Sequence, residues 1–444
     1  MFDWVGIAGR VEGSVIEALA LTWWLVVPLL LLVLLRDLWL WHVRVLALNK
    51  TEWTLLDIKI PAEVLKTPKA MEQVFSAVYS IYSYGTANEF FNKYWEGKME
   101  KWMSFEMVGM RGGVYFFARI PKDARRLVES AVYSQFPNAE IAETSDYMEL
   151  LPEALPNQTY DLWGTEMHLV RDSVYPIKTY YQFEEEVEER RIDPVGTIAE
   201  VMSNLREGEY ILIQYIVSPT GKLTGEDLTG EAKKIVDELL TGKKPAAKPP
   251  AFLGWIESIG EFIVNLVKAP VSYPEWGVGG MGGEEKKPER SFMNVTKGVA
   301  KAIEAVENKA AQQIFKTTIR AIYIDRRDSF TPLNVAAIMG YFSQFNTYNL
   351  NAFKPKLTTY AKVWGRILPW WKKFRLTVIK REYFKRYRSR TFGRKNLLGK
   401  EKLPILSTEE LATLYHFPIT GVEAPSLRRL PSKTGEPPAT LPVK

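Results

Sequence analysis

The chain has 444 residues, of which 46% are hydrophobic and 25% are charged, and its formal net charge is +6 at pH 7. This composition is typical of a folded protein, and the length suggests two or three domains. The absence of cysteine excludes disulfides, thiolate metal sites and cysteine nucleophiles. The three histidines are too far apart in the sequence for an HExxH-type metal pair.

An uncharged apolar run, Ala18–Leu35, lies near the start of the chain, and Leu38–Trp41 extends it. About 20 apolar residues span a bilayer as a helix, so the run predicts a transmembrane helix over 18–41 after a short extracytoplasmic stretch, 1–17. A cleaved signal peptide is the alternative, but acidic residues precede the run and bulky residues follow it. Basic residues are concentrated after the run. We therefore expect a single-pass protein of the cytoplasmic (inner) membrane, with its N-terminus outside and its bulk in the cytoplasm.

Residues 50–150 contain the pattern of one small α+β domain. A strand is predicted over 54–61, a helix over 69–84, a hairpin over 103–121, a second helix over 122–136 and a last strand over 139–143. This βαββαβ order is that of a ferredoxin-like domain.

Residues 175–356 contain a similar order. Strands are predicted at 179–183, 210–217 and 317–325, helices at 194–205 and 332–345, and a closing segment at 351–354. An insertion over 219–312 separates the central strands. It contains a proline-rich linker at 243–250, an amphipathic helix at 252–268, a glycine-rich loop at 276–283 and a long helix at 295–314. The predicted fold is α+β: one N-terminal transmembrane helix, two ferredoxin-like domains, the second with this insertion, and a basic C-terminal extension over 366–444.

No motif in the sequence predicts catalysis. The run GVGGMG, Gly277–Gly282, has the glycine spacing of a dinucleotide site but lacks the strand before it and the helix after it, so we interpret it as a linker. No Walker A loop or GxSxG elbow occurs. The acidic run Glu184–Glu189 is typical of a solvated surface. We therefore predict a protein that is not an enzyme, with no catalytic residue, cofactor or metal.

Two segments are candidates for binding. The helix at 252–268 could lie on a membrane, but its acidic polar face favours packing on a partner or on the chain's own core. The block Trp370–Lys402 mixes basic residues with Phe374, Tyr383, Phe384, Tyr387 and Phe392. This mixture suits nucleic acid, an anionic lipid surface, or a solvated or partner-facing helix. Its candidate nucleic-acid or lipid ligands are Lys372, Lys373, Arg375, Lys380, Arg381, Lys385, Arg386, Arg388, Arg390, Arg394 and Lys395.

Three stretches carry a family resemblance: Leu55–Ser80, Ser104–Ile141, and Leu406–Pro418 followed by Gly435–Pro442. Together they resemble the membrane-anchored N-terminal region of DNA-transfer ATPases of the type IV secretion and conjugation kind, the TraG/TraD coupling-protein and HerA-like relatives. In those proteins the last stretch comes just before the ATPase core. Because this sequence ends at Lys444, where that core would begin, we expect the ATPase to be a separate polypeptide or this chain to be a stand-alone relative.

The resemblance implies a non-enzymatic membrane anchor or scaffold of a type IV secretion-like machine for DNA or protein transfer. Its expected partners are membrane lipid, a hexameric ATPase, DNA and further copies of itself. The implied ATPase-docking residues are Glu409, Glu410, Leu411, Leu414, Tyr415, His416 and Phe417. The alternative function is a self-assembling structural protein of the cell envelope.

Overall fold

The computed structural model describes residues 51–60, 66–81, 101–111, 113–183, 193–221, 226–241, 296–359, 369–393, 395–396, 399–400 and 402–418, with parts of 24–50. A nine-stranded sheet dominates this part of the chain, and every strand pairing in it is antiparallel. The order is β4 (Glu140–Glu143), β1 (Trp53–Lys59), β3 (Gly113–Pro121), β2 (Met103–Met110), β6 (Tyr210–Thr220), β7 (Ile314–Arg326), β5 (Tyr160–Leu169) and β8 (Phe353–Thr358), and β11 (Ile405–Ser407) also pairs with β7.

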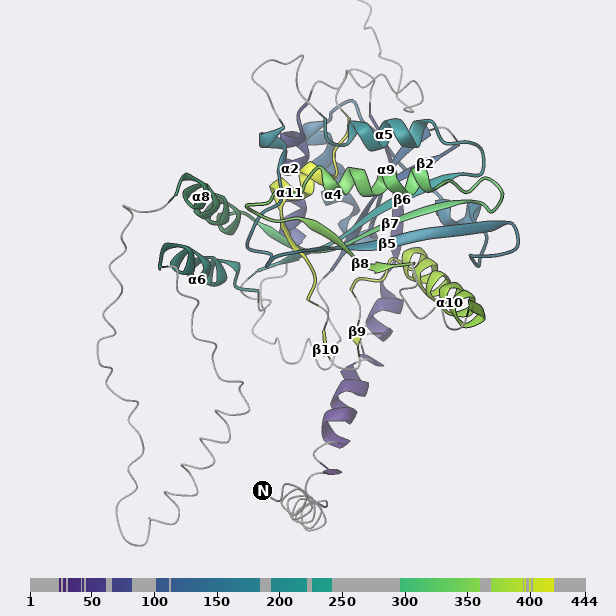
Figure 1. Ribbon diagram of the computed structural model, residues 1–444, viewed down its shortest axis with the longest axis horizontal. Helices are drawn as coiled ribbons and strands as arrows, with labels where there is room; N and C mark the ends of the chain where they lie inside the picture. Colours follow the sequence, from purple (N-terminus) through teal and green to yellow (C-terminus); the bar gives the residue numbers. More distant parts are fainter. Residues whose placement is uncertain are drawn as a thin grey trace, which may run out of the picture.

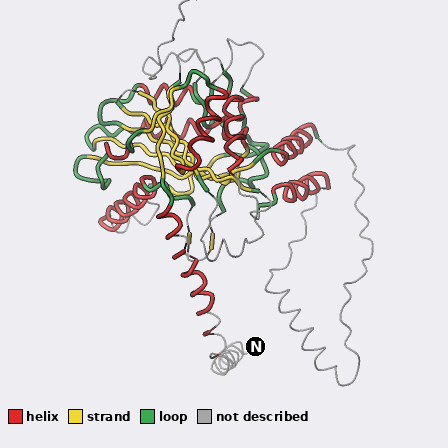
Figure 2. Tube along the Cα trace, turned by 180° about the vertical axis from the view of Figure 1, so that it is seen from behind, coloured by secondary structure: helices red, strands yellow, loops and turns green. Residues whose placement is uncertain are grey.

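Helices cover both faces of the sheet unequally (Figure 1). The larger core lies on one face, under α2 (Pro68–Val78), α4 (Arg125–Gln135), α5 (Gly196–Ser203), α9 (Pro332–Ser343) and α11 (Thr408–Leu414). The smaller core lies on the other face, under η3 (Tyr147–Leu150) and α10 (Pro369–Arg388). Figure 2 shows from behind that α6 (Leu228–Thr241) and α8 (Lys297–Ala311) form a pair at the end of the molecule away from α10. The short elements η1 (Tyr79–Ile81), η2 (Lys122–Ala124), η4 (Tyr180–Gln182), β9 (Lys395–Asn396) and β10 (Gly399–Lys400) complete the described structure.

The central strands are buried on both faces because helices cover both faces of the sheet. Strand β6, YILIQYIVSPT, is buried at every position after Tyr210. Helix α9 begins after Thr331, whose hydroxyl accepts from the Leu333 amide, and Pro332 occupies its first turn. Sequence pattern and local chemistry therefore agree on these elements.

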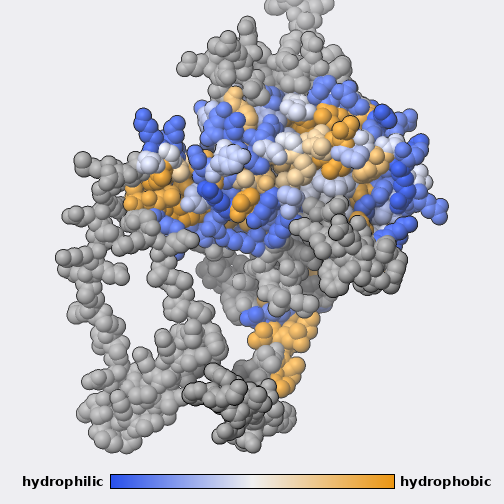
Figure 3. Space-filling model, viewed as in Figure 1, coloured by the Kyte–Doolittle hydropathy of each residue, from blue (hydrophilic) through white to orange (hydrophobic). Residues whose placement is uncertain are grey.

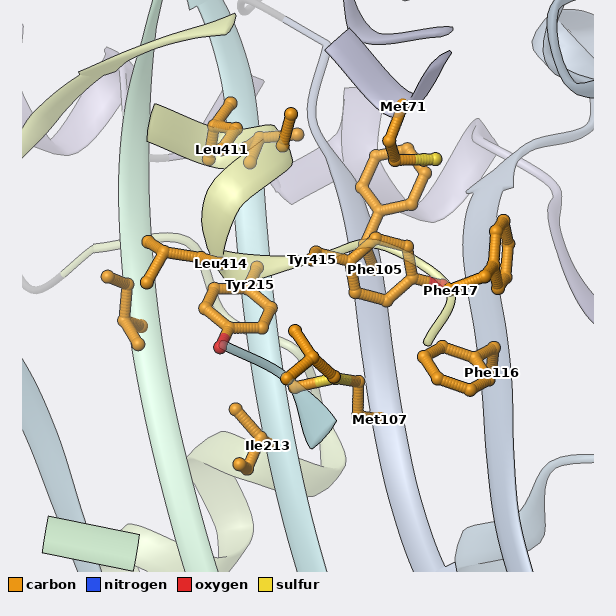
Figure 4. Close-up of a cluster of buried hydrophobic side chains, with 14 of the residues drawn as sticks. Met71, Phe105, Met107, Phe116, Ile213, Tyr215, Leu411, Leu414, Tyr415 and Phe417 are labelled. Atoms are coloured by element: carbon orange, nitrogen blue, oxygen red, sulfur yellow. The ribbon is translucent and has the colours of Figure 1, made fainter. Parts of the chain in front are cut away.

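Residues 405–417, within the last described segment, form part of the large core, and we call them the C-terminal strap. Its strand β11 pairs with β7, and its helix α11 packs on α2. After the helix, the ring of Tyr415 lies 5.4 Å from the ring of Phe105 and 5.8 Å from that of Phe116. Figure 4 shows Leu411, Leu414, Tyr415 and Phe417 converging with side chains of the sheet and α2. The strap thus fills the core beneath elements that precede it by about 300 residues or more.

The prediction of two separate ferredoxin-like domains is wrong. Both predicted units lie in one sheet, because β2 pairs with β6 along its whole length, from Met103 opposite Val217 to Met110 opposite Tyr210. The strand predicted at 179–183 is also wrong, since η4 occupies this place. The strand that fills the corresponding position in the sheet is β5, which the sequence pattern did not reveal.

The predicted single-pass membrane topology is corrected as well. Part of the predicted span, residues 18–23, 25–26, 29–30 and 41, lies outside the described residues. Among the residues that are described, no helix combines the length and the apolar character needed to cross a membrane. The described helical stretch 31–40 is mostly hydrophobic (Figure 3), and Leu31 and Leu35 in it are largely exposed. It also contains the ion pair between Arg36 and Asp37, 2.9 Å apart. The prediction of an inner-membrane location is therefore wrong.

Several predicted features lie outside the described residues: the N-terminal stretch 1–17, the acidic run 184–189, the linker 243–250, the amphipathic helix 252–268 and the glycine-rich loop 276–283. The long helix predicted over 295–314 is α8. Helix α6, which precedes the undescribed part of the insertion, was not predicted.

Candidate interaction site on helix α10

Helix α10 is the most basic element of the described structure and is fixed to the sheet by its C-terminal half. The rings of Tyr383, Phe384 and Tyr387 are buried in the smaller core, among residues of β5, β6 and β7. The Tyr383 hydroxyl donates to the carbonyl of Thr165 on β5. Gly164 makes this contact possible, because a Cβ at that position would overlap the Tyr383 ring. Because Gly164 has no side chain, α10 can pack close against β5 at this position.

The Gly164→Val substitution should therefore push α10 away from the sheet. We expect a loss of about 1–3 kcal/mol in the free energy of unfolding, the usual cost of overpacking a closely packed core. Urea denaturation followed by circular dichroism would measure it. Gly298→Val in α8 is a matched control for the replacement of glycine by valine, because a Cβ at Gly298 would meet nothing within 4 Å. An equal loss in both variants would contradict this account of Gly164.

Arg390 ends the helix in an unusual way. It has φ of +49°, in the left-handed region that favours glycine. Its amide donates to the Tyr387 carbonyl and the Thr391 amide donates to the Arg386 carbonyl, which is the hydrogen-bond pattern of a Schellman cap with Arg390 in the glycine position. An arginine in that position requires a compensating interaction.

The compensation is a buried ion-pair network, which we call the Arg390 anchor: Arg390 with Glu106 and Asp146. The guanidinium donates to Glu106 at 2.7 and 3.1 Å and to Asp146 at 2.6 and 2.9 Å, so both carboxylates are bound in bidentate fashion. Arg390 and Glu106 are at most 1% exposed. Glu106 also accepts from Ser104 at 2.5 Å and Tyr147 at 2.7 Å.

The network determines the charges of its members. Burial alone would raise the pKa of Glu106, but the positive charge and hydrogen bonds of Arg390, with those from Ser104 and Tyr147, lower it below its ordinary value. The pKa of Asp146 is lowered too, since the hydrogen bonds and charge of Arg390 outweigh its partial burial. Burial and the neighbouring Glu106 raise the pKa of the Tyr147 phenol, so this hydroxyl stays a donor. The anchor is therefore fully ionised at neutral pH.

A row of polar side chains continues the anchor across the sheet. Glu106, Gln214, Arg320 and Glu166 are direct neighbours on β2, β6, β7 and β5. Gln214 donates to Glu106 at 3.0 Å, and Arg320 lies 3.3 Å from Glu166. Arg320 also donates to the Thr391 carbonyl at 2.6 Å, just beyond the anchor. The end of α10 is thereby attached to four adjacent strands.

The opposite side of α10 presents an outer stripe: Phe374, Val378, Arg381 and Lys385. Their spacing of four, three and four residues places them on one face of the helix. All four are exposed, Phe374 by 61% and Val378 by 49%. Within the described part of the chain, no carboxylate pairs with Arg381 or Lys385. The stripe offers two cations and one aromatic ring to solvent.

The structure separates the predicted basic ligands into groups. Lys373, Arg375, Arg381 and Lys385 are exposed. Lys380 pairs with Asp161 at 2.6 Å, Arg386 pairs with Glu382 at 3.1 Å, and Arg388 donates to the carbonyls of Pro152 and Glu153. Arg390 is buried in the anchor. Lys372 belongs to α10 and Lys395 to β9, while Arg394 lies outside the described residues.

Of the interleaved aromatics, Tyr383, Phe384 and Tyr387 are core residues and Phe392 stacks on Trp102, so Phe374 remains as the exposed ring.

The predicted docking residues lie in the strap. Glu410, Leu411, Leu414, Tyr415, His416 and Phe417 are buried, and Glu409 is partly exposed. Glu410 completes a capping box with Ser407 and pairs with buried Lys309 on α8 at 2.7 Å. His416 contacts Asp193 at 2.9 Å. These side chains hold the chain together and offer little surface to a partner in the folded state.

Sequence reasoning missed the residues that anchor α10. Glu106 lies in the apolar run MSFEMVGM and Arg320 in TTIRAIYI. A lone charge inside a buried strand is rare unless it is paired, and this was the available signal.

A hollow of about 480 Å³ between η4, α8 and α11, lined in part by Lys309 and Glu410, was also missed. No cluster of three or more metal-ligating side chains occurs in the described part of the chain.

Comparison with known proteins assigns the family. Residues 44–429 match the family described as "Domain of unknown function (DUF8128)". The chain belongs to the DUF8128 family. The match extends from just before β1 to beyond the strap, so the sheet, α10 and the anchor all lie within the family domain. No curated protein matches the sequence.

Proposed function

We propose that this DUF8128 protein is a non-enzymatic scaffold of a type IV secretion-like transfer machine, which works with a separate ATPase and binds a polyanionic cargo along α10. One observation carries the proposal: exposed Arg381 and Lys385 lie on a helix whose other face is fixed by the buried Arg390 anchor. A rigid base preorganises cations for binding, since less side-chain and segment ordering is then lost. The machine is proposed from the resemblance of the three sequence stretches described above.

The edges of the sheet oppose the alternative, a self-assembling structural protein. Edge strand β8 exposes Lys354, Pro355 and Lys356, and edge strand β4 exposes Glu140 and Glu143. Charged residues and proline on an edge strand hinder pairing with a second sheet. The two edges are therefore poorly suited to edge-to-edge assembly.

Charge reversal on α10 tests the proposed binding. The double variant Arg381→Glu/Lys385→Glu should bind single- and double-stranded DNA at least about tenfold more weakly than the parent at low salt, because phosphate contacts are lost and like charges are introduced. Fluorescence anisotropy over a salt series would measure this. Lys233→Glu/Lys234→Glu on α6 is the matched control, since both lysines are exposed at the other end of the molecule (Figure 1). If both variants lose the same DNA affinity, the loss comes from the change in net charge and not from a binding site on α10.

Affinity purification of the full chain tests the scaffold role. We expect a HerA- or TraG-like ATPase to co-purify in stoichiometric amount and to be identified by mass spectrometry. Recovery of the chain alone, as a large homogeneous assembly, would instead favour the structural alternative.

A further inference from the structure

The hollow of about 480 Å³ lies between three segments that are distant in the sequence: residues 176–182, helix α8 and the start of the strap. Such a volume suits a small organic molecule. Its walls are fixed by buried contacts, because Glu410 accepts from the Ile177 amide at 2.8 Å and pairs with Lys309 of α8 at 2.7 Å. Lys309 also donates to the Ile405 carbonyl at 3.0 Å. These contacts hold the three segments in place relative to one another.

Gln312 brings an unpaired acceptor to the hollow. Its amide nitrogen donates to a carboxylate oxygen of Glu409 at 2.6 Å, and its amide oxygen is buried with no hydrogen-bond partner in the described part of the chain. The reverse orientation of the amide is disfavoured, since its oxygen would then face the carboxylate of Glu409. A buried acceptor without a donor is unfavourable, so this position favours a ligand that carries an N–H or O–H group.

The hollow also has an uncompensated negative charge. Of the three charged residues that line it, Lys309 and Glu410 neutralise each other, which leaves Glu409. Among the residues that the structure describes, no lysine or arginine forms an ion pair with Glu409. Burial raises the pKa of the nearby Glu72, and the negative charge of Glu409 adds to this increase. A positively charged ligand beside Glu409 would be attracted by both carboxylates.

The lining favours an organic cation over a metal ion. A calcium ion takes roughly six to eight oxygen ligands, and no cluster of three or more metal-ligating side chains occurs in the described residues. An ammonium group carries N–H donors for both the Gln312 amide oxygen and the Glu409 carboxylate. The ring of Tyr181, which is 49% exposed, also lines the hollow, and aromatic rings attract cations.

We infer that this hollow binds a primary alkylammonium group, which donates to the Gln312 amide oxygen and the Glu409 carboxylate and lies beside the Tyr181 ring. Both a small free amine and a lysine side chain of another protein carry such a group. The inference goes beyond the proposed scaffold function and does not depend on it, because α8 lies at the end of the molecule away from α10 (Figure 2).

Isothermal titration calorimetry of the full chain tests the inference with two probes of equal length, 1,4-diaminobutane and the neutral 1,4-butanediol. The diamine should bind at one site and the diol about tenfold or more weakly, because only the ammonium forms charge-assisted hydrogen bonds. Nα-acetyl-lysine methylamide distinguishes the two sources of the group. Tighter binding of the diamine assigns the hollow to a free amine, and tighter binding of the lysine derivative assigns it to a protein side chain.

Two variants locate the binding. Glu409→Gln keeps the shape of the side chain and should weaken diamine binding by about tenfold or more, and Gln312→Met, which removes the unpaired oxygen, should also weaken it. Glu307→Gln is the matched control, because Glu307 is exposed on α8 outside the lining, and it should change the affinity by less than about twofold. Circular dichroism would verify that each variant is folded.

Three results would overturn the inference: equal binding of diamine and diol, an unchanged affinity in a folded Glu409→Gln variant, or an equal loss in Glu307→Gln. None of them bears on the proposed binding of a polyanion, since that proposal is tested by Arg381 and Lys385 on α10.

Discussion

Replacing Arg390 by methionine should be one of the two most destabilising changes in this protein. The substitution leaves Glu106 buried without its principal cation, and removal of one partner of a buried ion pair costs about 3–5 kcal/mol. Urea denaturation should show the loss as a lower midpoint. It should also release α10, because the anchor holds the C-terminal end of that helix. Proteolysis near residue 388 would then become faster.

Three further variants distinguish charge from backbone strain. Arg386→Met is the matched control for the loss of an outer ion pair, since the Arg386 side chain is 15% exposed and pairs with the largely exposed Glu382, and its loss should cost at most about 1 kcal/mol. Arg390→Gly should be less destabilising than Arg390→Ala by about 1 kcal/mol, because glycine adopts φ of +49° without strain. If methionine at position 390 costs no more than at position 386, the anchor contributes no net stability.

Acid sensitivity gives an independent check on the same network. The folded-state pKa values of Glu106 and Asp146 lie below their ordinary values. Their stabilising contribution is therefore complete above the unfolded-state values, roughly pH 4 to 4.5, and is lost as the pH falls through the folded-state values. The double variant Glu106→Gln/Arg390→Met should lose part of this acid dependence. It should also be less destabilised at neutral pH than Arg390→Met alone, because it buries no unpaired charge.

The sequence allowed local structure to be predicted where the pattern was periodic. The strand predicted at 210–217 is β6, and the helix predicted at 332–345 is α9, because alternation and helical spacing report directly on buried faces. Strand β5, YDLWGTEMHL, was missed because polar and apolar residues alternate only from Glu166 to Leu169, and Gly164 stands in the middle of the strand. So short an alternating run does not by itself identify a strand that is buried on both faces.

Long-range pairing could not be predicted from one sequence. The joining of β2 to β6 depends on residues about 100 positions apart, and nothing local distinguishes a shared sheet from two separate sheets. The same limit applies to the candidate site. The basic character of α10 was readable, but which cations are exposed depends on the position of Glu106 and Asp146 below the end of that helix. The composition of the strap likewise does not show that it is buried, because its burial depends on contacts with strands and helices far away in the sequence.

The strap explains why the described part of the chain should fold as one cooperative unit. Tyr415 is fully buried and lies between residues of α2, β2, β3 and β6, with ring contacts to Phe75, Phe105, Phe116 and Tyr215. A large aromatic side chain truncated in such a core costs about 3–5 kcal/mol. The core of the N-terminal half therefore depends on residues close to the end of the described chain.

Tyr415→Ala should accordingly lower the free energy of unfolding by about 3–5 kcal/mol in a single transition seen by circular dichroism and by tryptophan fluorescence. Tyr348→Ala is the matched control, because that tyrosine is fully exposed and its loss should change stability by less than about 0.5 kcal/mol. A fragment of residues 51–150 should fail to show cooperative unfolding, since it lacks both the strap and the pairing of β2 with β6. Cooperative unfolding of that fragment would show that the first four strands form an independent domain after all.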